Sequence, residues 1–488
     1  MMKKFISIAA AFVISVSAFA QEDQIKSAEK ALKSDNLTEA KSLIDQVNIN
    51  EDNYYTLDPE MVSDYLFVKG SIYKAIGEKN NDDESLVNAA VAYTGLALVE
   101  SGKAYSAKNN ESGDYEYFRT QEDLDKAVAT GNYKKPKVKD RKQYHSAEVQ
   151  PIVQKLALDF HQGAIEAYNA QDFDKASKDF VNAYQVYKNP LFPTPADTTL
   201  LYNAAAVAVS ANNYPGALTI YEKLLEMDYT GITTVYEASN KETGEKQTFA
   251  SQEDLDMQMK FGVVENDTVY TTKNNQPSIY RSVGSIYLNM GDNLAKEDSL
   301  EKQKYYHQAL EVLKEGKAKY PGDYDLLLTL GNTYLKEGDQ QGFINAMQEA
   351  IAQDPTNEVL YYNIGVVSND LGMEAEAKAA YDKAIELKPD YTDAYINQAA
   401  AILGREKEIN EEISALPIKL NRANQAKLKS LKAEKQDIYK EAIGYLEGAY
   451  EYDKTNIGLL QTMKNIYYAL DRNDDYKRIS DELKALEE

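Results

Sequence analysis

A small residue recurs at a spacing of 34 between residues 321 and 399, and a proline precedes each occurrence by ten residues. The three pairs are Pro321 with Gly331, Pro355 with Gly365, and Pro389 with Ala399. Small residues allow two helices to cross closely, and a proline ends a helix. A period of this length therefore predicts a stack of helical hairpins, in which each hairpin covers the apolar face of the next.

Helix ends are also marked in this segment. Gly338 and Gly372 can adopt the left-handed conformation that ends the first helix of a hairpin. Asp323, Asn357 and Thr392 are predicted to cap the helices that follow them. Weaker copies of the pattern occur toward both ends of the chain, around Ala28, Gly70, Ala164, Ala205, Gly284, Ala442 and Leu460. Together these copies predict about nine hairpins.

Further positions repeat in register with the prolines, namely Tyr334, Ala350, Ala377, Tyr381 and Ala384. This order of small, aromatic, alanine and proline positions resembles the tetratricopeptide repeat (TPR). The resemblance implies an all-α fold, a right-handed α-α superhelix or TPR solenoid, whose first helices line an inner groove. It covers most of the chain and is most specific between Pro277 and Lys454. The chain is also similar to exported TPR proteins of Bacteroidota.

Two segments depart from the repeat pattern and match each other. Residues 105–131 align without gaps to residues 236–262 and share twelve of twenty-seven positions. In each copy a β-prone segment, a glycine-containing turn and a short polar segment predict a β-hairpin. Thr120 and Ser251 then precede Gln-Glu-Asp-Leu-Asp, a capping-box arrangement that begins a short helix. We expect two inserted hairpin-plus-helix modules of the same shape, at equivalent repeat junctions.

The amino terminus has the features of a signal peptide. Lys3 and Lys4 precede an apolar run that leads to Ala18-Phe19-Ala20, a small-residue pattern that predicts cleavage before Gln21. The run is shorter than the roughly 20 residues that a membrane-spanning helix needs. We therefore expect an exported protein, in the periplasm or associated with the outer membrane, with no direct membrane insertion.

These features predict the organisation of the whole chain. It comprises a signal peptide at 1–20, degenerate TPR-like repeats at 21–104, inserted module 1 at 105–150, TPR-like repeats at 151–230, inserted module 2 at 231–276, and a C-terminal TPR array at 277–488 with an extended helical hairpin near 403–440. Pro417 is expected to kink or end the first arm of that hairpin.

The sequence shows none of the motifs by which an active site is usually recognised. The sequence has no cysteine, which excludes disulfides and thiolate metal sites. His145, His161 and His307 lie far apart and form no zinc motif, and no phosphate-binding glycine loop or nucleophile elbow occurs. We therefore expect no enzyme, no catalytic residues, no cofactor, no metal and no small-molecule ligand.

The net charge of the chain makes some classes of binding partner unfavourable. The 54 lysines and arginines against 78 aspartates and glutamates give a net charge of −24. Such a surface repels nucleic-acid phosphates and anionic lipid headgroups. We expect no nucleic acid among the partners.

A series of asparagines on the predicted first helices is the candidate binding site: Asn203, Asn332, Asn363 and Asn397. Asn203, Asn363 and Asn397 share the sixth position of the repeat, and Asn332 lies three residues further on. In related superhelices such asparagines hold the main chain of an extended peptide, since each amide offers both a donor and an acceptor. The alternative is that these polar residues only face water.

Tyrosine is unusually frequent, with 38 tyrosines against 12 phenylalanines. Adjacent pairs such as Tyr361-Tyr362 and Tyr467-Tyr468 cannot both point into a helical core, because neighbouring residues diverge by about 100° around the helix. Exposed tyrosines favour protein interfaces, or are simply placed on the surface. Tyr362 is therefore added to the candidate groove.

The resemblance implies a non-enzymatic scaffold or adaptor of the bacterial cell envelope, with other envelope proteins as partners. Leu328 and Asn397 stand where chaperone-binding relatives carry the basic residues that clamp a terminal carboxylate. One alternative is a periplasmic holdase, which would bind unfolded outer-membrane proteins along the groove. A third class is glycan capture for nutrient uptake, which the absence of cysteine and tryptophan disfavours.

Overall fold

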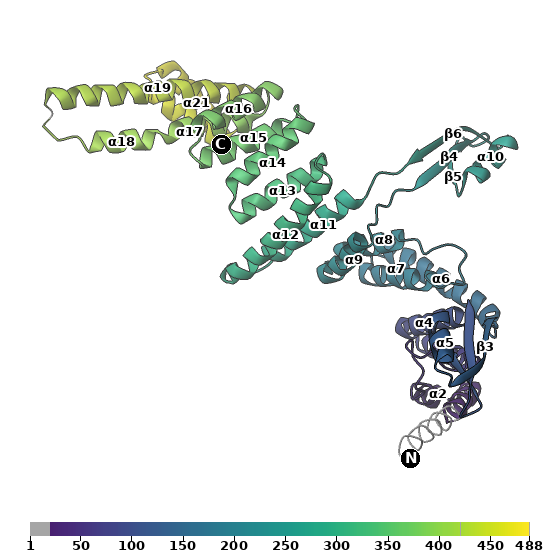
Figure 1. Cartoon of the computed structure of the whole chain (residues 1–488). Coiled ribbons are helices and arrows are strands. Elements are labelled where there is room, and N and C mark those ends of the chain that lie inside the picture. Colours follow the sequence, from purple (N-terminus) through teal and green to yellow (C-terminus); the bar gives the residue numbers. More distant parts are fainter. Residues whose placement is uncertain (1–19, 420, 488) are drawn as a thin grey trace, which may run out of the picture. The chain divides into compact units, whose positions relative to one another are not determined.

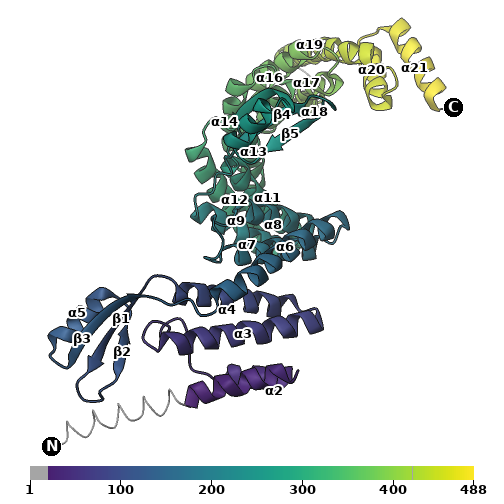
Figure 2. The same ribbon diagram turned by 90° about the vertical axis from the view of Figure 1, so that its right-hand side faces the viewer.

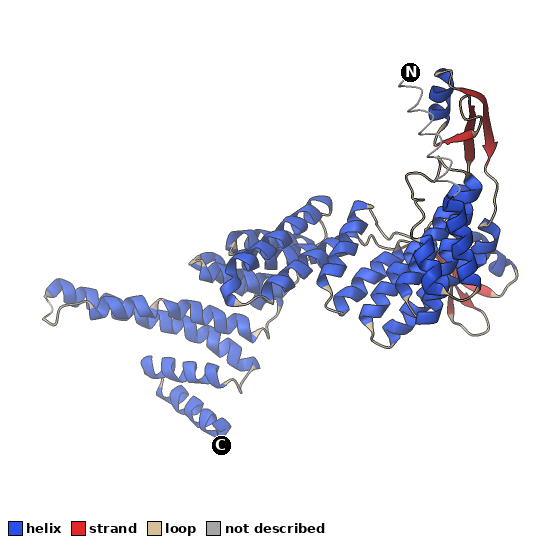
Figure 3. Cartoon of the chain, turned by 90° about the horizontal axis from the view of Figure 1, so that it is seen from below, coloured by secondary structure: helices blue, strands red, loops and turns tan. Residues whose placement is uncertain are grey.

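The computed structural model describes residues 20–419 and 421–487. All of the predicted signal peptide except Ala20 lies outside these residues. Helices dominate the described chain, and strands form two small groups, drawn in red in Figure 3. The predicted all-α fold class with two small insertions is confirmed. No helix in the described ranges is both long enough and apolar enough to cross a membrane.

The chain divides into two compact units, Met1–Lys273 and Asn274–Glu488. The described part of the first unit begins with a helix over residues 20–33. The helices that follow it are α2 (Leu37–Ile44), α3 (Pro59–Asn80), α4 (Asp83–Glu100), α5 (Gln121–Ala129), α6 (Ser146–Asn169), α7 (Phe173–Tyr187), α8 (Thr199–Ser210), α9 (Tyr214–Glu226) and α10 (Gln252–Lys260) (Figure 1). Consecutive helices such as α3 and α4 pack side by side as hairpins (Figure 2).

The second unit holds the most regular repeats. Its helices are α11 (Gln276–Asp292), a 3-10 turn (Lys296–Asp298), α12 (Ser299–Lys319), α13 (Tyr324–Glu337), α14 (Gln340–Gln353), α15 (Glu358–Asp370), α16 (Glu374–Leu387), α17 (Thr392–Gly404), α18 (Glu406–Ser414), α19 (Arg422–Tyr452), α20 (Ile457–Ala469) and α21 (Asn473–Glu487). The apolar core lies between successive hairpins. One cluster joins Leu327 of α13, Phe343 of α14 and Leu360 of α15.

The predicted helix boundaries hold with one exception. Asp323 accepts a hydrogen bond from the Leu326 N–H at 2.9 Å, and Asn357 caps α15 through the Val359 N–H at 3.0 Å. The prediction that Thr392 caps α17 was wrong. Thr392 is the first residue of that helix, so its hydroxyl lies past the position from which a side chain reaches back to the free N–H groups.

The small repeat positions mark close helix contacts. A Cβ atom on Gly365 of α15 would lie 2.8 Å from the ring of Tyr381 on α16. That distance is too short for any side chain, so only glycine lets this tyrosine pack flat against the neighbouring helix. The 34-residue period therefore records where the two helices of a hairpin touch.

The two insertions have the same fold. Module 1 contains β1 (Lys103–Asn109), β2 (Tyr115–Phe118) and β3 (Tyr133–Asp140), and module 2 contains β4 (Thr234–Asn240), β5 (Lys246–Phe249) and β6 (Val264–Thr271). Their sheets have the orders β2-β1-β3 and β5-β4-β6, and every pair is antiparallel. The hairpin and helix of each copy were predicted. The third strand was not, because β3 and β6 lie beyond the matching residues and share almost no sequence.

The duplicated residues explain the shared shape. Thr120 and Ser251 each accept the N–H of the third helical residue at 3.1 Å, as a capping box requires. Gly113 and Gly244 have φ angles of 81° and 71° in the hairpin turns, a conformation in which a side chain would be strained. Each module follows the second helix of a hairpin, α4 or α9.

The helical hairpin near 403–440 is built from complementary charges. α18 is acidic and the first half of α19 is basic. Lys427 pairs with Glu412 and Lys435 pairs with Glu406, both at 2.9 Å. Pro417 lies in the turn after α18, so the first arm ends before it.

Candidate binding groove

A groove lies between α13 and α15, the first helices of two successive repeats. We call it the α13–α15 groove; its volume is about 370 Å³. It is lined by Tyr324, Leu328, Asn332, Leu335, Phe343, Met347, Asn357, Val359, Leu360, Asn363, Val366 and Val367. The lining is therefore mostly apolar, with a few polar groups among the aliphatic side chains, which is the usual character of a ligand site. A larger hollow of about 850 Å³ runs along α17 and α18, but only these helices and the turn after them line it, so it is an open surface.

Two members of the asparagine series meet in this groove. Asn332 comes from α13 and Asn363 from α15, and both line the same hollow. Asn332 is exposed and Asn363 is half-buried. Within residues 20–419 and 421–487, neither side-chain amide has a hydrogen-bonding partner. Their donors and acceptors are thus available to a bound chain.

Asn397 has a different environment. Its Nδ2 donates to the Tyr362 hydroxyl at 2.7 Å, so this amide is engaged within the protein. The Tyr362 ring also contacts Tyr391, with the ring centroids 5.0 Å apart. Burial raises the pKa of Tyr362. Asn397 and Tyr362 therefore hold α15 and α17 together.

Asn203 belongs to the other compact unit. It lies on α8, where it is half-buried, beside Tyr202 in the sequence. Asn203, Asn363 and Asn397 thus share a position in the repeat pattern but differ in their surroundings. The structure brings together only Asn332 and Asn363.

The apolar part of the groove was missed from the sequence. Leu335 and Val359 are 39% and 42% exposed, although aliphatic side chains of this size usually turn inward. Tyr324 also lines the groove, and its hydroxyl accepts a hydrogen bond from Asn357 Nδ2 at 2.7 Å. The available signal was the presence of leucine and valine on the polar faces of two amphipathic helices.

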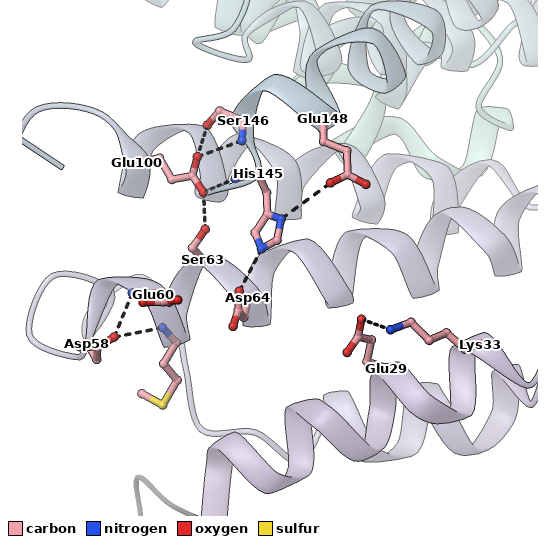
Figure 4. Close-up of polar contacts among 11 residues, drawn as sticks. Glu29, Lys33, Asp58, Glu60, Ser63, Asp64, Glu100, His145, Ser146 and Glu148 are labelled. Carbon is pink, nitrogen blue, oxygen red and sulfur yellow. Dashed lines mark hydrogen bonds and ion pairs between the residues drawn. The ribbon is translucent and has the colours of Figure 1, made fainter. Parts of the chain in front are cut away.

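A second polar cluster surrounds His145, at the start of α6 (Figure 4). His145 Nε2 lies 2.9 Å from Asp64 Oδ1, and the imidazole stacks on Phe67 with ring centroids 4.2 Å apart. The hydroxyls of Ser63 and Ser146 both donate to the Glu100 carboxylate rather than to the imidazole. The cluster therefore lacks the nucleophile–base contact that acyl-transfer chemistry needs.

Glu100 joins α4 to α6 at the base of module 1. Only 3% of this residue is exposed. Its buried carboxylate accepts hydrogen bonds from the N–H groups of His145 and Ser146, each at 2.9 Å. Burial opposes ionisation, but the hydrogen bonds from Ser146, Ser63 and the two N–H groups outweigh it, so the pKa of Glu100 lies below its ordinary value. Glu100 is thus an ionised cap for the first turn of α6.

Other charged side chains give no sign of a metal centre. Among the residues that the structure describes, no three histidine, aspartate or glutamate side chains lie close enough together to hold a metal ion.

Sequence comparison identifies the repeats. Residues 324–357 and 359–391 match the family model described as Tetratricopeptide repeat. These two segments include the α13–α15 groove and the Pro355 and Gly365 positions of the 34-residue period.

Curated relatives match over short segments. Protein STIP1 homolog of Dictyostelium discoideum is 32% identical over 97 residues, which are 20% of this chain and 17% of that protein. Hsp70-Hsp90 organising protein of Plasmodium falciparum is 33% identical over 86 residues, which are 18% of this chain and 34% of that protein. The chain therefore covers about a third or less of the length of these relatives.

The solved structures that match are less similar in sequence. MamA protein is 18% identical with a TM-score of 0.32, over 53% of this chain and 92% of that one. YrrB, described as a TPR protein with an unusual peptide-binding site, is 16% identical with a TM-score of 0.30, over 49% of this chain and 89% of that one. The assignment rests on the sequence match and on the helical hairpins described above. Residues 324–391 are therefore tetratricopeptide repeats within an all-α chain of helical hairpins.

Proposed function

We propose that this chain is a protein-interaction scaffold whose α13–α15 groove holds an extended segment of a partner protein. The observation that carries the proposal is the pair of unengaged amides, Asn332 and Asn363, set among apolar side chains. Each amide can donate to and accept from a peptide main chain, while Leu335 and Val359 supply apolar contact. Relatives named as organising proteins of Hsp70 and Hsp90 support a protein-binding role.

The groove favours an internal segment over a free carboxyl terminus. Leu328 lines the groove at one position where chaperone-binding relatives carry a basic side chain. Asn397 stands at the other such position, and its amide is hydrogen-bonded to the Tyr362 hydroxyl. A terminal carboxylate buried there would lack a cationic partner, which costs several kcal/mol. An internal segment, whose chain continues in both directions, has no terminal carboxylate and avoids this cost.

The partner segment should be found by crosslinking from within the groove. A photoreactive amino acid in place of the exposed Leu335 would trap it in living cells, and mass spectrometry would identify the crosslinked peptide. Asn369 lies on α15 but outside the groove, so the same substitution there is the matched control. Equal crosslinking from both positions would contradict the proposal.

Replacing Asn332 and Asn363 by alanine together should weaken binding of that peptide by about tenfold, because each lost amide contact is worth roughly 0.5–1.5 kcal/mol. Isothermal titration with the synthetic segment measures the change. Asn369→Ala should leave the affinity unaltered. Asn397→Ala should instead lower the free energy of unfolding by about 1 kcal/mol, since it removes the bond to Tyr362. Unchanged affinity in the double variant would show that the groove is not the binding surface.

We further propose that the scaffold works in the bacterial cell envelope, with envelope proteins as partners. This rests on the sequence of residues 1–20, a basic start followed by an apolar run and Ala18-Phe19-Ala20. The sequence has no cysteine, so the proposal does not include the lipid of a lipoprotein.

The mature protein should begin at Gln21 and fractionate with the cell envelope. Amino-terminal sequencing of the protein from its own cells measures this. Replacing Lys3 and Lys4 by glutamate should retain the precursor in the cytosol, because the charge before the apolar run directs export. An intact Met1 on cytosolic protein would refute the proposed location.

A further inference from the structure

The two modules share one fold but have different free edges. In each sheet the third strand is an outer strand with one side unpaired, β3 in module 1 and β6 in module 2. The residues of β3 and β6 correspond at an offset of 131, as do their left-handed bulge residues, Lys135 and Asn266, with φ angles of 50° and 53°. Differences between the two edges therefore reflect side chains and not strand geometry.

In each module, every second N–H group of the third strand points away from the strand with which it pairs. Arg141 N–H donates to Gly102 at 3.0 Å, and the equivalent Thr272 N–H donates to Thr233 at 2.9 Å. Because inward and outward groups alternate along an antiparallel strand, the N–H groups of Val269 and Thr271 point away from β4. The N–H group of Asp267 is also not needed for pairing with β4. The equivalent residue of β3 is Pro136, which has no N–H, and β3 nevertheless pairs with β1 in the same register.

Module 1 carries the features that protect an edge strand. Pro136 has no N–H, and β3 itself contains four lysines, Lys134, Lys135, Lys137 and Lys139. Lysine and proline are the residues with which natural sheets prevent another strand from pairing. Module 1 is also held against the helices, since Tyr117 donates to Asp58 at 3.1 Å.

Module 2 lacks these features. β6 has no proline and no lysine, and Tyr270, which is 46% exposed, stands where β3 has Lys139. Val269 is 46% exposed, as is the equivalent Val138 of β3. The charge of β6 is opposite to that of β3: Glu265 stands in place of Lys134, and Asp267 adds a carboxylate where β3 has the uncharged Pro136. Residues 234–271 contain eight acidic and three basic residues, net −5, whereas residues 103–140 contain seven acidic and eight basic, net +1.

From these observations we infer that β6 is a docking edge, which takes up an extended segment of another protein as a fourth strand of the module 2 sheet. The outward N–H groups supply the main-chain hydrogen bonds, and Val269 and Tyr270 cover alternate side chains of the added strand. The acidic edge selects a segment in which lysine or arginine alternates with apolar residues. Pairing with β6 of a second copy is disfavoured, because it would bring two acidic edges together, and β3 of a second copy is blocked as a pairing edge by Pro136. β6 shares no residue with the lining of the α13–α15 groove.

The test uses the mature chain and a short fluorescent peptide of lysine alternating with valine and threonine. A matched peptide has glutamate in place of lysine. Anisotropy should show binding of the lysine peptide that weakens with salt, and no binding of the glutamate peptide. Hydrogen exchange should show protection of residues 264–272 on binding, but not of residues 133–141.

The decisive variant grafts the protected edge onto module 2. Glu265→Lys with Asp267→Pro copies residues that module 1 already accommodates in the same fold, and it should weaken peptide binding by at least about tenfold. The reciprocal pair in module 1, Lys134→Glu with Pro136→Asp, is the control and should not weaken peptide binding. Unchanged hydrogen exchange of residues 246–262 shows that the grafted module remains folded.

Three results would overturn the inference. They are equal binding of the two peptides, an equal loss of affinity in both variants, and self-association of the chain in sedimentation equilibrium with residues 264–272 protected in the absence of peptide. The last result would assign the edge to a second copy.

Discussion

Replacing Glu100 by alanine should lower the free energy of unfolding of the first unit by about 4 kcal/mol, among the largest effects of a single substitution. The change leaves buried the Ser63 hydroxyl and the N–H groups of His145 and Ser146, all of which now donate to the carboxylate. Each unsatisfied buried group costs about 1–3 kcal/mol. Urea unfolding followed by circular dichroism measures the loss, and hydrogen exchange of α6 locates it.

Glu84 provides the control, because it lies on the same helix, α4, and is exposed. Glu84→Ala should change the free energy of unfolding by less than about 0.5 kcal/mol. Similar losses in the two variants would show that Glu100 does not hold α4 and α6 together.

The contribution of Glu100 should also depend on pH. Its pKa is lower in the folded protein than the ordinary value of 4.5, so its ionised form stabilises the fold above that pH. This stability is lost as the pH falls through the folded-state pKa. The difference in unfolding free energy between the native protein and Glu100→Gln should therefore be full at neutral pH and shrink below pH 4.5.

Replacing Tyr467 by alanine should lower the free energy of unfolding of the second unit by about 3–5 kcal/mol, as expected when a buried aromatic ring leaves a cavity. Tyr467 lies on α20 with 0% of its surface exposed, in a cluster with Leu446, Met463 and Ile479. Its hydroxyl also donates to Glu447 at 2.9 Å. Thermal and urea unfolding of the full chain measure the loss.

The chain offers a matched control in the next residue. Tyr468 is 72% exposed and contacts Tyr476 at a centroid distance of 5.8 Å. Tyr468→Ala should cost less than about 1 kcal/mol. Comparable losses at both positions would mean that the core between the last hairpins does not carry the stability of this unit.

This pair shows what pattern alone could predict. Two adjacent tyrosines cannot both enter a helical core, and the structure places Tyr467 inside and Tyr468 outside. For Tyr361 and Tyr362 the same rule was less decisive, because both side chains are half-buried. The rule predicts divergence of the two side chains but not which neighbour covers each one.

The candidate site also shows what the sequence pattern could predict and what it could not. The repeat period predicted that Asn332, Asn363 and Asn397 lie on first helices, and they do. Whether an amide is free depends on residues from other helices, and Tyr362 from α15 engages Asn397 across 35 positions of sequence. The exposed leucine and valine of the groove were not recognised as part of a site, because an aliphatic residue normally predicts burial.

By itself, the sequence determined the helical hairpins, their 34-residue period, most helix ends and the duplication of the inserted modules. These features depend on local preferences: glycine and proline restrict the backbone, caps satisfy nearby N–H groups, and apolar periodicity defines a buried face. The tertiary structure alone decided which asparagines remain free, how Glu100 joins two helices across an insertion, and that each module has a third strand. These outcomes depend on contacts between residues far apart in the chain, and a hydrogen bond or a paired strand edge exists only once folding has brought its two partners together.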